Sequence, residues 1–474
     1  MMVRTRFAPS PTGSIHIGSV YNFLLNYAYA KAKGGKFILR VEDTDQKRYV
    51  KKAEDHLYQG LAWVGIEPDE GPKKGGDFGP YRQSERLDIY QKYARQLLDQ
   101  GDAYYCFCSP KRLEKVRVEC RGKKCPPMYD KKCRNLSKKE AEERVARGEK
   151  AVVRMKIPDN QVVIAKDLIR GEIKFKSKHI DDQVILKSDG FPTYHLAVVV
   201  DDHLMKITHV VRGHEWLPSF PKHVLLYRYL GWKMPHILHT PVLLDPAGGK
   251  LSKRRGDTNL GWFQRQGFLP EAILNYLCLL GWSHPQGKEI FSLKEFIKAF
   301  DLKDVSPVSP TFDLVKLEWV NGMYIRAKKD EELVKLLKSF LPKMNEEQIK
   351  IAAPLIKERI KRLVEAEELL EFVWCCPKYG KDLLLKKIDR KTAKEMLIKA
   401  QEVIEKRGID DFQKLQEELI KLIKKEGWKA GEFFMVLRVA ICAKSITPPI
   451  LESLPLVGKK ETLSRIEAAM KKLD

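Results

Sequence analysis

Short strand patterns alternate with helical patterns through the first part of the chain, and this alternation restricts the possible folds more than any other feature. Residues 3–8 (VRTRFA) and 36–41 (KFILRV) are typical of buried strands. Helical patterns occupy 17–33, 51–64 and 85–100. Strands that alternate with helices form parallel sheets, because each helix returns the chain to the edge where the previous strand began. We therefore predict an α/β chain whose first domain is a Rossmann-like parallel sheet.

A basic segment that contains several cysteines interrupts this rhythm at residues 104–189. It holds 23 Lys and Arg against 13 Asp and Glu, an excess of +10, and we predict that it is an inserted α+β domain. The α/β pattern resumes beyond it. We expect strands at 194–200 (YHLAVVV) and 206–211, followed by a helix at 217–230.

The pattern from residue 326 to residue 474 is helical and rich in Lys and Glu. Apolar residues recur there at helical spacing, and the charged residues between them are typical of solvated helix faces. This predicts an all-α C-terminal region with helices at 331–340, 351–373, 392–406, 412–425 and 462–473.

The net charge indicates the kind of partner. Among 474 residues, 87 Lys and Arg stand against 63 Asp and Glu, which gives +24. Such an excess favours a polyanion, either a nucleic acid or an anionic membrane surface. The chain has no apolar run of membrane-spanning length and opens with no signal-peptide pattern, so we expect a cytoplasmic protein with no membrane partner. A hydrophobic share of 43% excludes intrinsic disorder.

The loop after the first strand pattern, residues 9–19 (PSPTGSIHIGS), is the first candidate for chemistry. Ligands of open parallel sheets bind beyond the carboxyl ends of the strands. We expect a helix that begins near Ile17 to point free backbone N–H groups at an anion, and His16 to donate to a phosphate oxygen. Gly18 would let a flat ring approach the backbone. Taken alone, a single His at a helix start is more often structural, and no Walker sequence is present here.

The second candidate is the basic loop 250–255 (KLSKRR), which lies between glycines. Lys250 and Lys253 are three residues apart, a spacing that suits a mobile clamp on developing phosphate charge. In isolation, a solvated basic loop is the simpler interpretation.

Together these segments carry a resemblance. HIGS (16–19) and KLSKR (250–254) resemble the HIGH and KMSKS signatures of class I aminoacyl-tRNA synthetases. The surrounding sequence is similar, more narrowly, to the bacterial type of glutamyl-tRNA synthetase, and the resemblance covers the whole chain. The blocks that carry it are RFAPSPTG (6–13), ILRVEDTD (38–45), YHLAVVVDDHLM (194–205) and VVRGHEWL (210–217).

The resemblance implies an activity and a nucleotide site. Members of this family form an aminoacyl adenylate from ATP, with Mg²⁺, and esterify the 2′-hydroxyl of the terminal adenosine of tRNA. By similarity, His16 and Lys253 contact ATP phosphates and Lys250 assists; these are the three catalytic positions. The ATP site implied in this way comprises His16, Gly18, Lys250, Ser252, Lys253 and Arg254.

The resemblance also implies an L-glutamate site. Arg6 and Arg212 match positions that meet substrate carboxylates, for which the planar guanidinium fork is suited. Glu42 matches the position that holds the α-ammonium, and Ser10 and Tyr194 match positions that add hydrogen bonds. The family commonly has Asn four residues after that tyrosine, whereas this chain has valine at position 198, a departure from the family's pattern of polar contacts to the amino acid.

The cysteine-containing segment predicts a metal site. Cys106-x-Cys108, followed by Tyr129 and Cys133, resembles the zinc site that some family members carry in the insertion. Thiolates suit tetrahedral Zn²⁺. From spacing alone, Cys120 and Cys125 are equally able to supply ligands, and the spacing departs from the usual CxxC pair.

The domain roles follow from the same resemblance. We expect a catalytic domain at 1–103 and 190–240, an acceptor-stem-binding insertion at 104–189, a stem-contact region at 241–325 and an anticodon-binding domain at 326–474. The expected partner is tRNA-Glu and the expected state a monomer. Two alternatives stay open: an enzyme that also charges tRNA-Gln, and a non-catalytic nucleic-acid-binding protein of the same fold. Candidates for anticodon contacts are Arg359, Arg362 and Arg438.

Overall fold

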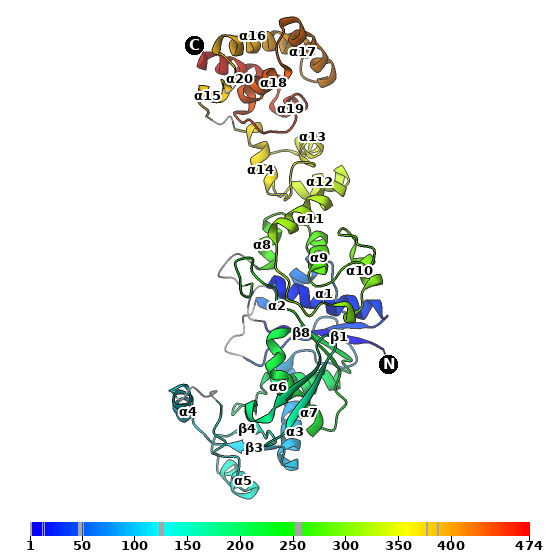
Figure 1. Ribbon diagram of the computed structural model, residues 1–474, viewed down its shortest axis with the longest axis vertical. Coiled ribbons are helices and arrows are strands. Elements are labelled where there is room, and N and C mark those ends of the chain that lie inside the picture. The colour runs from blue at the N-terminus through cyan, green and yellow to red at the C-terminus, as the bar shows by residue number, and fades with distance from the viewer. Residues whose placement is uncertain are drawn as a thin grey trace. The chain divides into compact units, whose positions relative to one another are not determined.

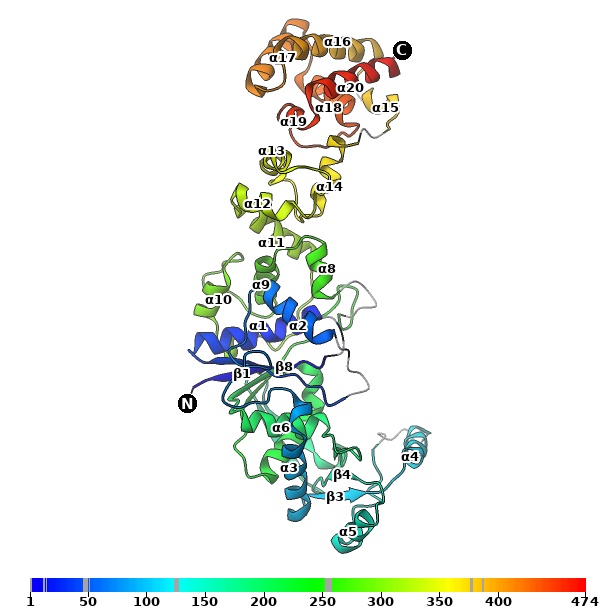
Figure 2. The same cartoon turned by 180° about the vertical axis from the view of Figure 1, so that it is seen from behind.

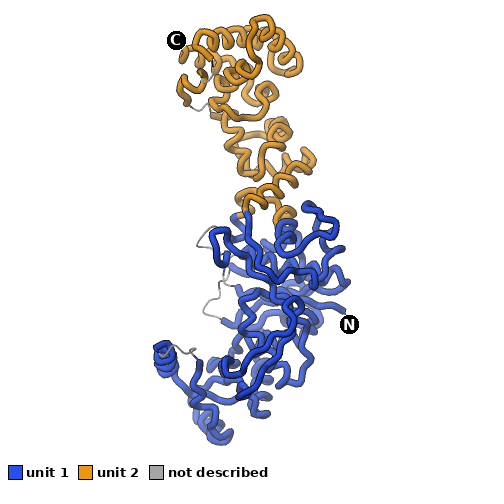
Figure 3. The backbone as a smooth tube through the Cα atoms, in the orientation of Figure 1, with its two compact units in different colours: residues 1–262, 274–313 blue, residues 263–273, 314–474 orange. Residues whose placement is uncertain are grey.

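The structure is a computed structural model, and it describes residues 2–11, 13, 15–45, 50, 52–122, 128–251, 258–375, 378–385 and 388–474. The chain divides into two compact units, coloured separately in Figure 3. Unit 1 comprises residues 1–262 and 274–313, and unit 2 comprises residues 263–273 and 314–474. In the described ranges, no helix is both long and apolar enough to cross a membrane.

Unit 1 begins with the predicted strand, helix and strand. Strand β1 (Arg4–Phe7) pairs in parallel with β2 (Lys36–Leu39), with Arg6 opposite Ile38. Between them runs α1 (Ile17–Ala32), whose apolar side chains are buried against both strands. In Figures 1 and 2, α1 lies on one side of these strands and α6 and α7 lie on the other. The α/β prediction for this domain is confirmed.

A second sheet in unit 1 has the strand order β6-β5-β9-β8. Its central pair, β8 (His209–Gly213) and β9 (His236–Thr240), is parallel. The hairpin of β5 (Val162–Asp167) and β6 (Gly171–Lys176) extends it, since β5 pairs in parallel with β9 at Asp167. Helix α7 (Phe220–Tyr229) packs on this sheet through Phe220, which is fully buried.

The segment 194–200 corrects a prediction, because it is helical and not a strand. It forms the first part of α6 (Tyr194–Leu204), whose residues Leu196–Val200 are buried. An unbroken apolar run looks the same whether it is a buried strand or a helix enclosed on all sides. Here α3 (Leu87–Gln100) and α7 both pack against it, and this enclosure, which is tertiary, overrides the β preference of three consecutive valines.

A smaller antiparallel sheet lies within residues 103–186. Its order is β3 (Ala103–Cys106), β4 (Val152–Met155) and β7 (Val184–Leu186). Two short helices, α4 (Pro110–Gly122) and α5 (Lys138–Ala146), accompany it. Other helices associated with the first 313 residues are α2 (Ala53–Trp63), α8 (Leu260–Arg265), α9 (Pro270–Leu279) and α10 (Leu293–Ala299).

The described part of unit 2 from residue 314 onward is helical, as predicted. The long helix expected at 351–373 is instead interrupted. The interruption is stabilised by tertiary hydrogen bonds, because Leu363 N–H donates to Gly267 (3.1 Å) and the Asn321 amide donates to the Lys361 carbonyl (2.6 Å). The helices are α11 (Leu314–Ala327), α12 (Asp330–Leu337), α13 (Glu346–Ile356), α14 (Glu365–Leu370), α15 (Lys381–Leu384), α16 (Arg390–Arg407), α17 (Phe412–Glu426), α18 (Ala430–Cys442), α19 (Ile450–Val457) and α20 (Lys459–Lys472).

Candidate active site

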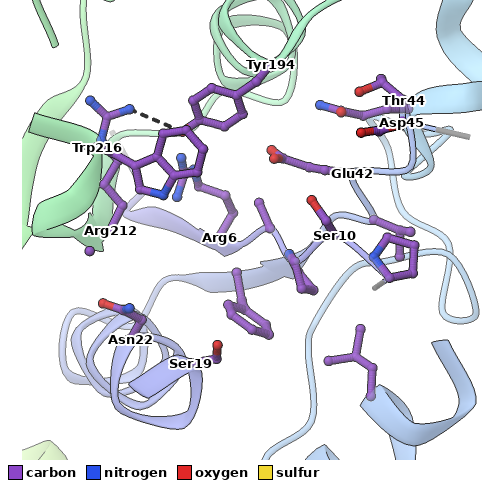
Figure 4. A pocket seen from close by; sticks show the side chains of 18 of the residues that line it. Arg6, Ser10, Ser19, Asn22, Glu42, Thr44, Asp45, Tyr194, Arg212 and Trp216 are labelled. Atoms are coloured by element: carbon purple, nitrogen blue, oxygen red, sulfur yellow. Dashed lines mark hydrogen bonds between the residues drawn. The ribbon is translucent and has the colours of Figure 1, made fainter. Parts of the chain in front are cut away.

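A pocket of about 830 Å³ opens in unit 1 at the carboxyl ends of β1, β2 and β8. Residues that follow each of these strands line it, together with the N-terminal residues of α1 and α6. Its position is the one where ligands of parallel sheets bind, and its volume suits a small molecule. Polar lining residues include Arg6, Ser10, His16, Glu42, Asp45, Tyr194, Arg212 and Glu215. Six of them, Arg6, Ser10, Glu42, Asp45, Tyr194 and Arg212, are labelled in Figure 4.

Arg6, near the end of β1, lines the pocket, and its guanidinium is also bound to a carboxylate of the protein. Its Nε and Nη2 donate to the two oxygens of Asp202 on α6, at 3.0 and 3.3 Å. Its third nitrogen, Nη1, makes no hydrogen bond with the residues that the structure describes. Asp202 also accepts from Arg40 (2.7 Å). Arg6 is therefore held rigidly, and one donor remains for a ligand.

Glu42 lies opposite, at the end of β2, and is 8% exposed. Arg40 donates to its carboxylate (3.0 Å), which holds the side chain in one place. Burial raises the pKa of Glu42, although Arg40 and Arg6 both favour the ionised form. A carboxylate in this setting gains from a second cation, such as a substrate ammonium.

Arg212, at the end of β8, is the buried cation of the pocket that has no carboxylate partner. It is 6% exposed, and no acidic oxygen lies within 4.0 Å of it among the described residues. Its Nε donates to Nε2 of His239 (3.0 Å), and its Nη1 contacts Nδ1 of His223 (2.9 Å) and the Tyr194 hydroxyl (3.4 Å). Its Nη2 is buried and has no hydrogen-bond partner in the part of the chain that the structure describes. A buried cation with an unsatisfied donor favours an anion in the pocket.

Aromatic rings close this end of the pocket. Tyr194 and Trp216 stack with ring centroids 4.0 Å apart, and Figure 4 shows them beside Arg212. Such a wall excludes water and strengthens the electrostatic interactions that Arg212 makes. Val198, where the family commonly has Asn, is 1% exposed in the hydrophobic core and does not line the pocket.

His16 lies at the other side of the pocket, as the N-cap of α1. Its Nδ1 accepts the N–H of Gly18 at 2.9 Å, so in the neutral ring the proton is on Nε2, a donor that suits a phosphate oxygen. The expectation of free N–H groups here is wrong, because Ile17 N–H donates to the Thr258 carbonyl (2.8 Å) and Gly18 N–H is used by the cap. Gly18 does not line the pocket. A Cβ at Gly18 would lie 3.1 Å from the His16 ring, so glycine there makes room for the cap.

The basic loop is described only at its start. Lys250 lies 3.9 Å from Glu215, which lines the pocket. Ser252, Lys253 and Arg254 lie outside the described residues, and their predicted roles stay predictions.

A second cluster lies in the small sheet around β3. The sulfur atoms of Cys106, Cys108 and Cys133 lie within 4.8 Å of one another, and those of Cys108 and Cys133 are 3.6 Å apart. The Tyr129 hydroxyl is 3.4 Å from the sulfurs of Cys106 and Cys108. Cys120 is not part of this group, and Cys125 lies outside the described residues.

Two arginines contact the cysteine cluster. The guanidinium of Arg154 lies over the Tyr129 ring, 3.9 Å from its centroid, and Arg112 donates to the Cys108 sulfur (3.4 Å). Burial opposes ionisation of the Cys106 thiol, but its hydrogen bonds with Tyr129 and with the Cys108 backbone, together with the nearby Arg154, lower its pKa overall. Burial raises the pKa of the Cys108 thiol to about 11, so the two thiols differ in how readily they ionise.

The three arginines proposed for anticodon contact differ in their surroundings within unit 2. Arg362 is engaged by Glu365 (2.9 Å) and Glu318 (3.4 Å). Arg359 is exposed. Arg438, on α18, has a buried Nε without a hydrogen-bond partner, and burial lowers its pKa.

Sequence reasoning missed several residues that build the pocket. Trp216 lies in VVRGHEWL, and its aromatic side chain beside Arg212 was a usable signal. Asp202 is the second of two adjacent aspartates that directly follow an apolar run, and this pattern was also a usable signal. Nothing in the local sequence marks His223 or His239 as partners of Arg212, since they come from α7 and β9.

A parallel α/β sheet, a pocket at its carboxyl edge and a histidine-capped helix beside it are the features expected of a class I aminoacyl-tRNA synthetase. Comparison with known families agrees. Residues 2–319 match the family described as tRNA synthetases class I (E and Q), catalytic domain, and residues 332–470 match the family described as anticodon binding domain.

Individual relatives identify the family within this class of synthetases. The glutamate–tRNA ligase of Treponema denticola is 42% identical over 99% of both chains, and that of Thermus thermophilus is 44% identical over 99% of this chain and 100% of the relative. A crystal structure of a glutamate tRNA ligase from Elizabethkingia meningosepticum, in complex with its amino acid, is 36% identical, with a TM-score of 0.91 over 100% of both chains. The chain belongs to the glutamate–tRNA ligase family. The resemblance and fold class predicted from the sequence are thereby confirmed.

Proposed function

We propose that the chain attaches L-glutamate to tRNA-Glu in two steps, through a glutamyl adenylate formed from ATP. The observation that carries this proposal is Arg212, a buried cation that lines the pocket and that has, among the residues the structure describes, no carboxylate partner and no hydrogen-bond partner for Nη2. An amino acid with an anionic side chain supplies the missing charge. Glutamine, which is neutral, does not.

The proposed orientation of glutamate follows from the positions of the charges. The α-carboxylate must reach the α-phosphate of ATP, so it faces the end of the pocket where His16 lies. The α-ammonium pairs with Glu42, and Ser10 and Tyr194 are within the same lining to add hydrogen bonds. The side-chain carboxylate is then left for Arg212 and the remaining Nη1 donor of Arg6. Two arginines and one carboxylate complement a glutamate zwitterion in charge.

The chemistry in this proposal needs no side-chain nucleophile. The α-carboxylate oxygen attacks the α-phosphorus and pyrophosphate leaves; the 2′-hydroxyl of the tRNA then attacks the acyl carbon and AMP leaves. The protein positions the reactants and stabilises charge on the phosphate oxygens. His16, through Nε2–H, and the lysines of the basic loop would supply this stabilisation. Mg²⁺, when bound to the triphosphate, supplies further charge neutralisation, and Asp45 and Glu215 are carboxylates of the lining that suit it.

The test is the charging reaction itself, with purified tRNA-Glu and tRNA-Gln, each with glutamate and with glutamine. In Arg212→Met, we expect the KM for glutamate to rise about 10- to 100-fold, the range for a lost hydrogen bond to a charged group. The control is Arg228→Met on α7, an exposed arginine remote from the pocket lining, which should behave as the parent protein.

The same assay separates the alternatives. Charging of both tRNAs with glutamate would identify the enzyme that also accepts tRNA-Gln. Binding of tRNA without charging, and without ATP–pyrophosphate exchange in its presence, would identify a non-catalytic nucleic-acid-binding protein and overturn the proposal. The charge of Arg212, which has no carboxylate partner among the described residues, favours the enzyme, because a protein that binds only nucleic acid has no use for such a cation in this pocket.

We also propose that Cys106, Cys108, Cys133 and Tyr129 hold one structural Zn²⁺. At a Zn–S distance of about 2.3 Å, tetrahedral geometry separates two sulfurs by about 3.8 Å. The 3.6 Å between Cys108 and Cys133 is close to that value, and three sulfurs with a hydroxyl form a complete four-donor set. The donors therefore fit the metal. When bound, zinc would supply cross-linking between β3 and the loop at 128–133.

The remaining expectations stay predictions: the domain boundaries, a monomeric state and a cytoplasmic location.

A further inference from the structure

The surroundings of Arg212 show an unusual way of holding an arginine. Buried arginines are ordinarily held by carboxylates, as Arg6 and Arg40 are held by Asp202 in the same unit. Arg212 is held by two imidazoles, through its Nε to His239 and its Nη1 to His223. His239 is fully buried and His223 is 4% exposed.

The hydrogen-bond pattern assigns the proton on each ring. Asp167, at the end of β5, accepts from Nδ1 of His239 (2.8 Å), so His239 is protonated there and its Nε2 is left as the acceptor for Arg212. His223 receives the Arg212 donor at Nδ1, so its Nε2 carries the proton and faces Nδ1 of His195 (3.2 Å). Both rings are thus neutral acceptors toward Arg212.

The electrostatic environment keeps them neutral. The pKa of His239 is lowered to about 4, chiefly by burial and also by Arg212, although the hydrogen bond to Asp167 opposes the shift. Burial and the neighbouring Arg212 lower the pKa of His223 well below its ordinary value. Neither ring competes with a substrate for the charge of Arg212, whereas a carboxylate in either place would neutralise it.

We propose that His223 and His239 are neutral positioning residues, which fix Arg212 by hydrogen bonds while reserving its full charge for the side-chain carboxylate of the amino acid. Selectivity for an anionic over a neutral amino acid then depends on two residues that do not line the pocket. Asp167 contributes by setting the tautomer of His239. This inference rests on the proposed function, because it assumes that Arg212 meets that carboxylate.

The test compares two variants of nearly equal shape, His223→Glu and His223→Gln, which differ in charge. In the charging assay, we expect the Glu variant to raise the KM for glutamate about 10- to 100-fold, with a smaller effect on kcat, and to lower the ratio of kcat/KM for glutamate over glutamine. The Gln variant keeps a neutral acceptor and should recover most of the affinity. Equal losses in both variants would overturn the inference, because a role in packing alone does not distinguish them.

A second measurement reads the protonation of the two rings in the unsubstituted protein. In the parent enzyme labelled with ¹⁵N-histidine, the His223 and His239 nitrogen shifts at pH 7 should be those of neutral rings, one nitrogen protonated and one not. A protonated ring at either position would overturn the inference even if the His223 variants do not fold. If the parent protein does not charge tRNA with glutamate at all, the proposed function fails, and that result is distinct from either outcome above.

Discussion

Arg6 and Arg212 line the same pocket, but they differ in how much of their charge a ligand can use. Arg6 donates two hydrogen bonds to Asp202, so mainly its Nη1 is left to donate to a ligand. Within the described ranges, Arg212 donates only to neutral groups and has a buried nitrogen without a partner. Loss of Arg212 should therefore weaken binding of an anionic ligand more than loss of Arg6, because of these two arginines Arg212 is the one without a carboxylate partner among the described residues.

At the same scale, Lys253→Ala tests the basic loop. We expect kcat to fall about 10²- to 10³-fold with little change in the KM for glutamate, because the charge of Lys253 is needed mainly as the phosphate rearranges. Steady-state charging kinetics measure both constants. Lys233→Ala, at an exposed turn after α7, is the control and should have no effect. A normal turnover number in Lys253→Ala would contradict the role assigned to the loop.

Among the elements, the β1–β2 pair is anchored by one carboxylate. Glu70 accepts two hydrogen bonds from Arg4 on β1 (both 2.8 Å), one from Lys36 on β2 (2.9 Å) and one from the Tyr81 hydroxyl (2.6 Å). These donors, Arg4 foremost, lower the pKa of Glu70 to about 2. Glu70 therefore stabilises the two strands that carry Arg6 and Glu42 to the pocket.

Replacement of that anchor gives a stability prediction. Glu70→Gln should destabilise unit 1 by about 3 kcal/mol, because it leaves a buried Arg4 without its counter-charge. Since the folded pKa lies below the ordinary value of 4.5, the stabilisation is present above pH 4.5 and is lost as the pH falls toward 2. Thermal unfolding from neutral to acidic pH should thus show a difference between variant and parent that shrinks below pH 4.5. Glu67→Gln, an exposed neighbour, should cost less than about 0.5 kcal/mol at any pH.

The cysteine cluster gives a second prediction about an element. We expect one zinc per chain in the purified protein, lost in Cys106→Ser and kept in Cys120→Ser, because only Cys106 belongs to the group of close sulfurs. Elemental analysis measures this directly. Removal of the metal with a chelator should also lower the unfolding temperature of the parent protein. Zinc kept in Cys106→Ser but lost in Cys120→Ser would overturn the proposed ligands. A parent protein without zinc would overturn the site itself.

At the scale of the whole molecule, the charge of +24 makes a prediction about tRNA binding. If it serves the phosphate backbone, the logarithm of the tRNA affinity should fall linearly with the logarithm of the salt concentration, because binding releases counterions. Fluorescence anisotropy with labelled tRNA between about 50 and 200 mM salt measures the slope. A binding constant that does not change across this range would mean that the excess of Lys and Arg has another purpose.

Local sequence determined much of this protein. The strand, breaker-rich loop and helix that present His16 are predictable because each depends on residues close in the chain, and the C-terminal helices are predictable from their 3.6-residue period. The cysteine positions likewise indicated a cluster. The pocket-lining residues Arg6, Glu42, Tyr194 and Arg212 were predicted through the resemblance to a family and not through periodicity.

Tertiary structure decided the rest. Enclosure by α3 and α7 made residues 194–200 helical, where the apolar run alone favoured a strand. Arg6 is paired with a carboxylate 196 residues away, and Arg212 is paired with histidines 11 and 27 residues away. Whether a buried guanidinium is neutralised or kept available depends on which side chains the fold brings within hydrogen-bond distance of it. That depends on the packing of distant elements, because Coulomb and hydrogen-bond energies depend on separation in space and not on separation along the chain.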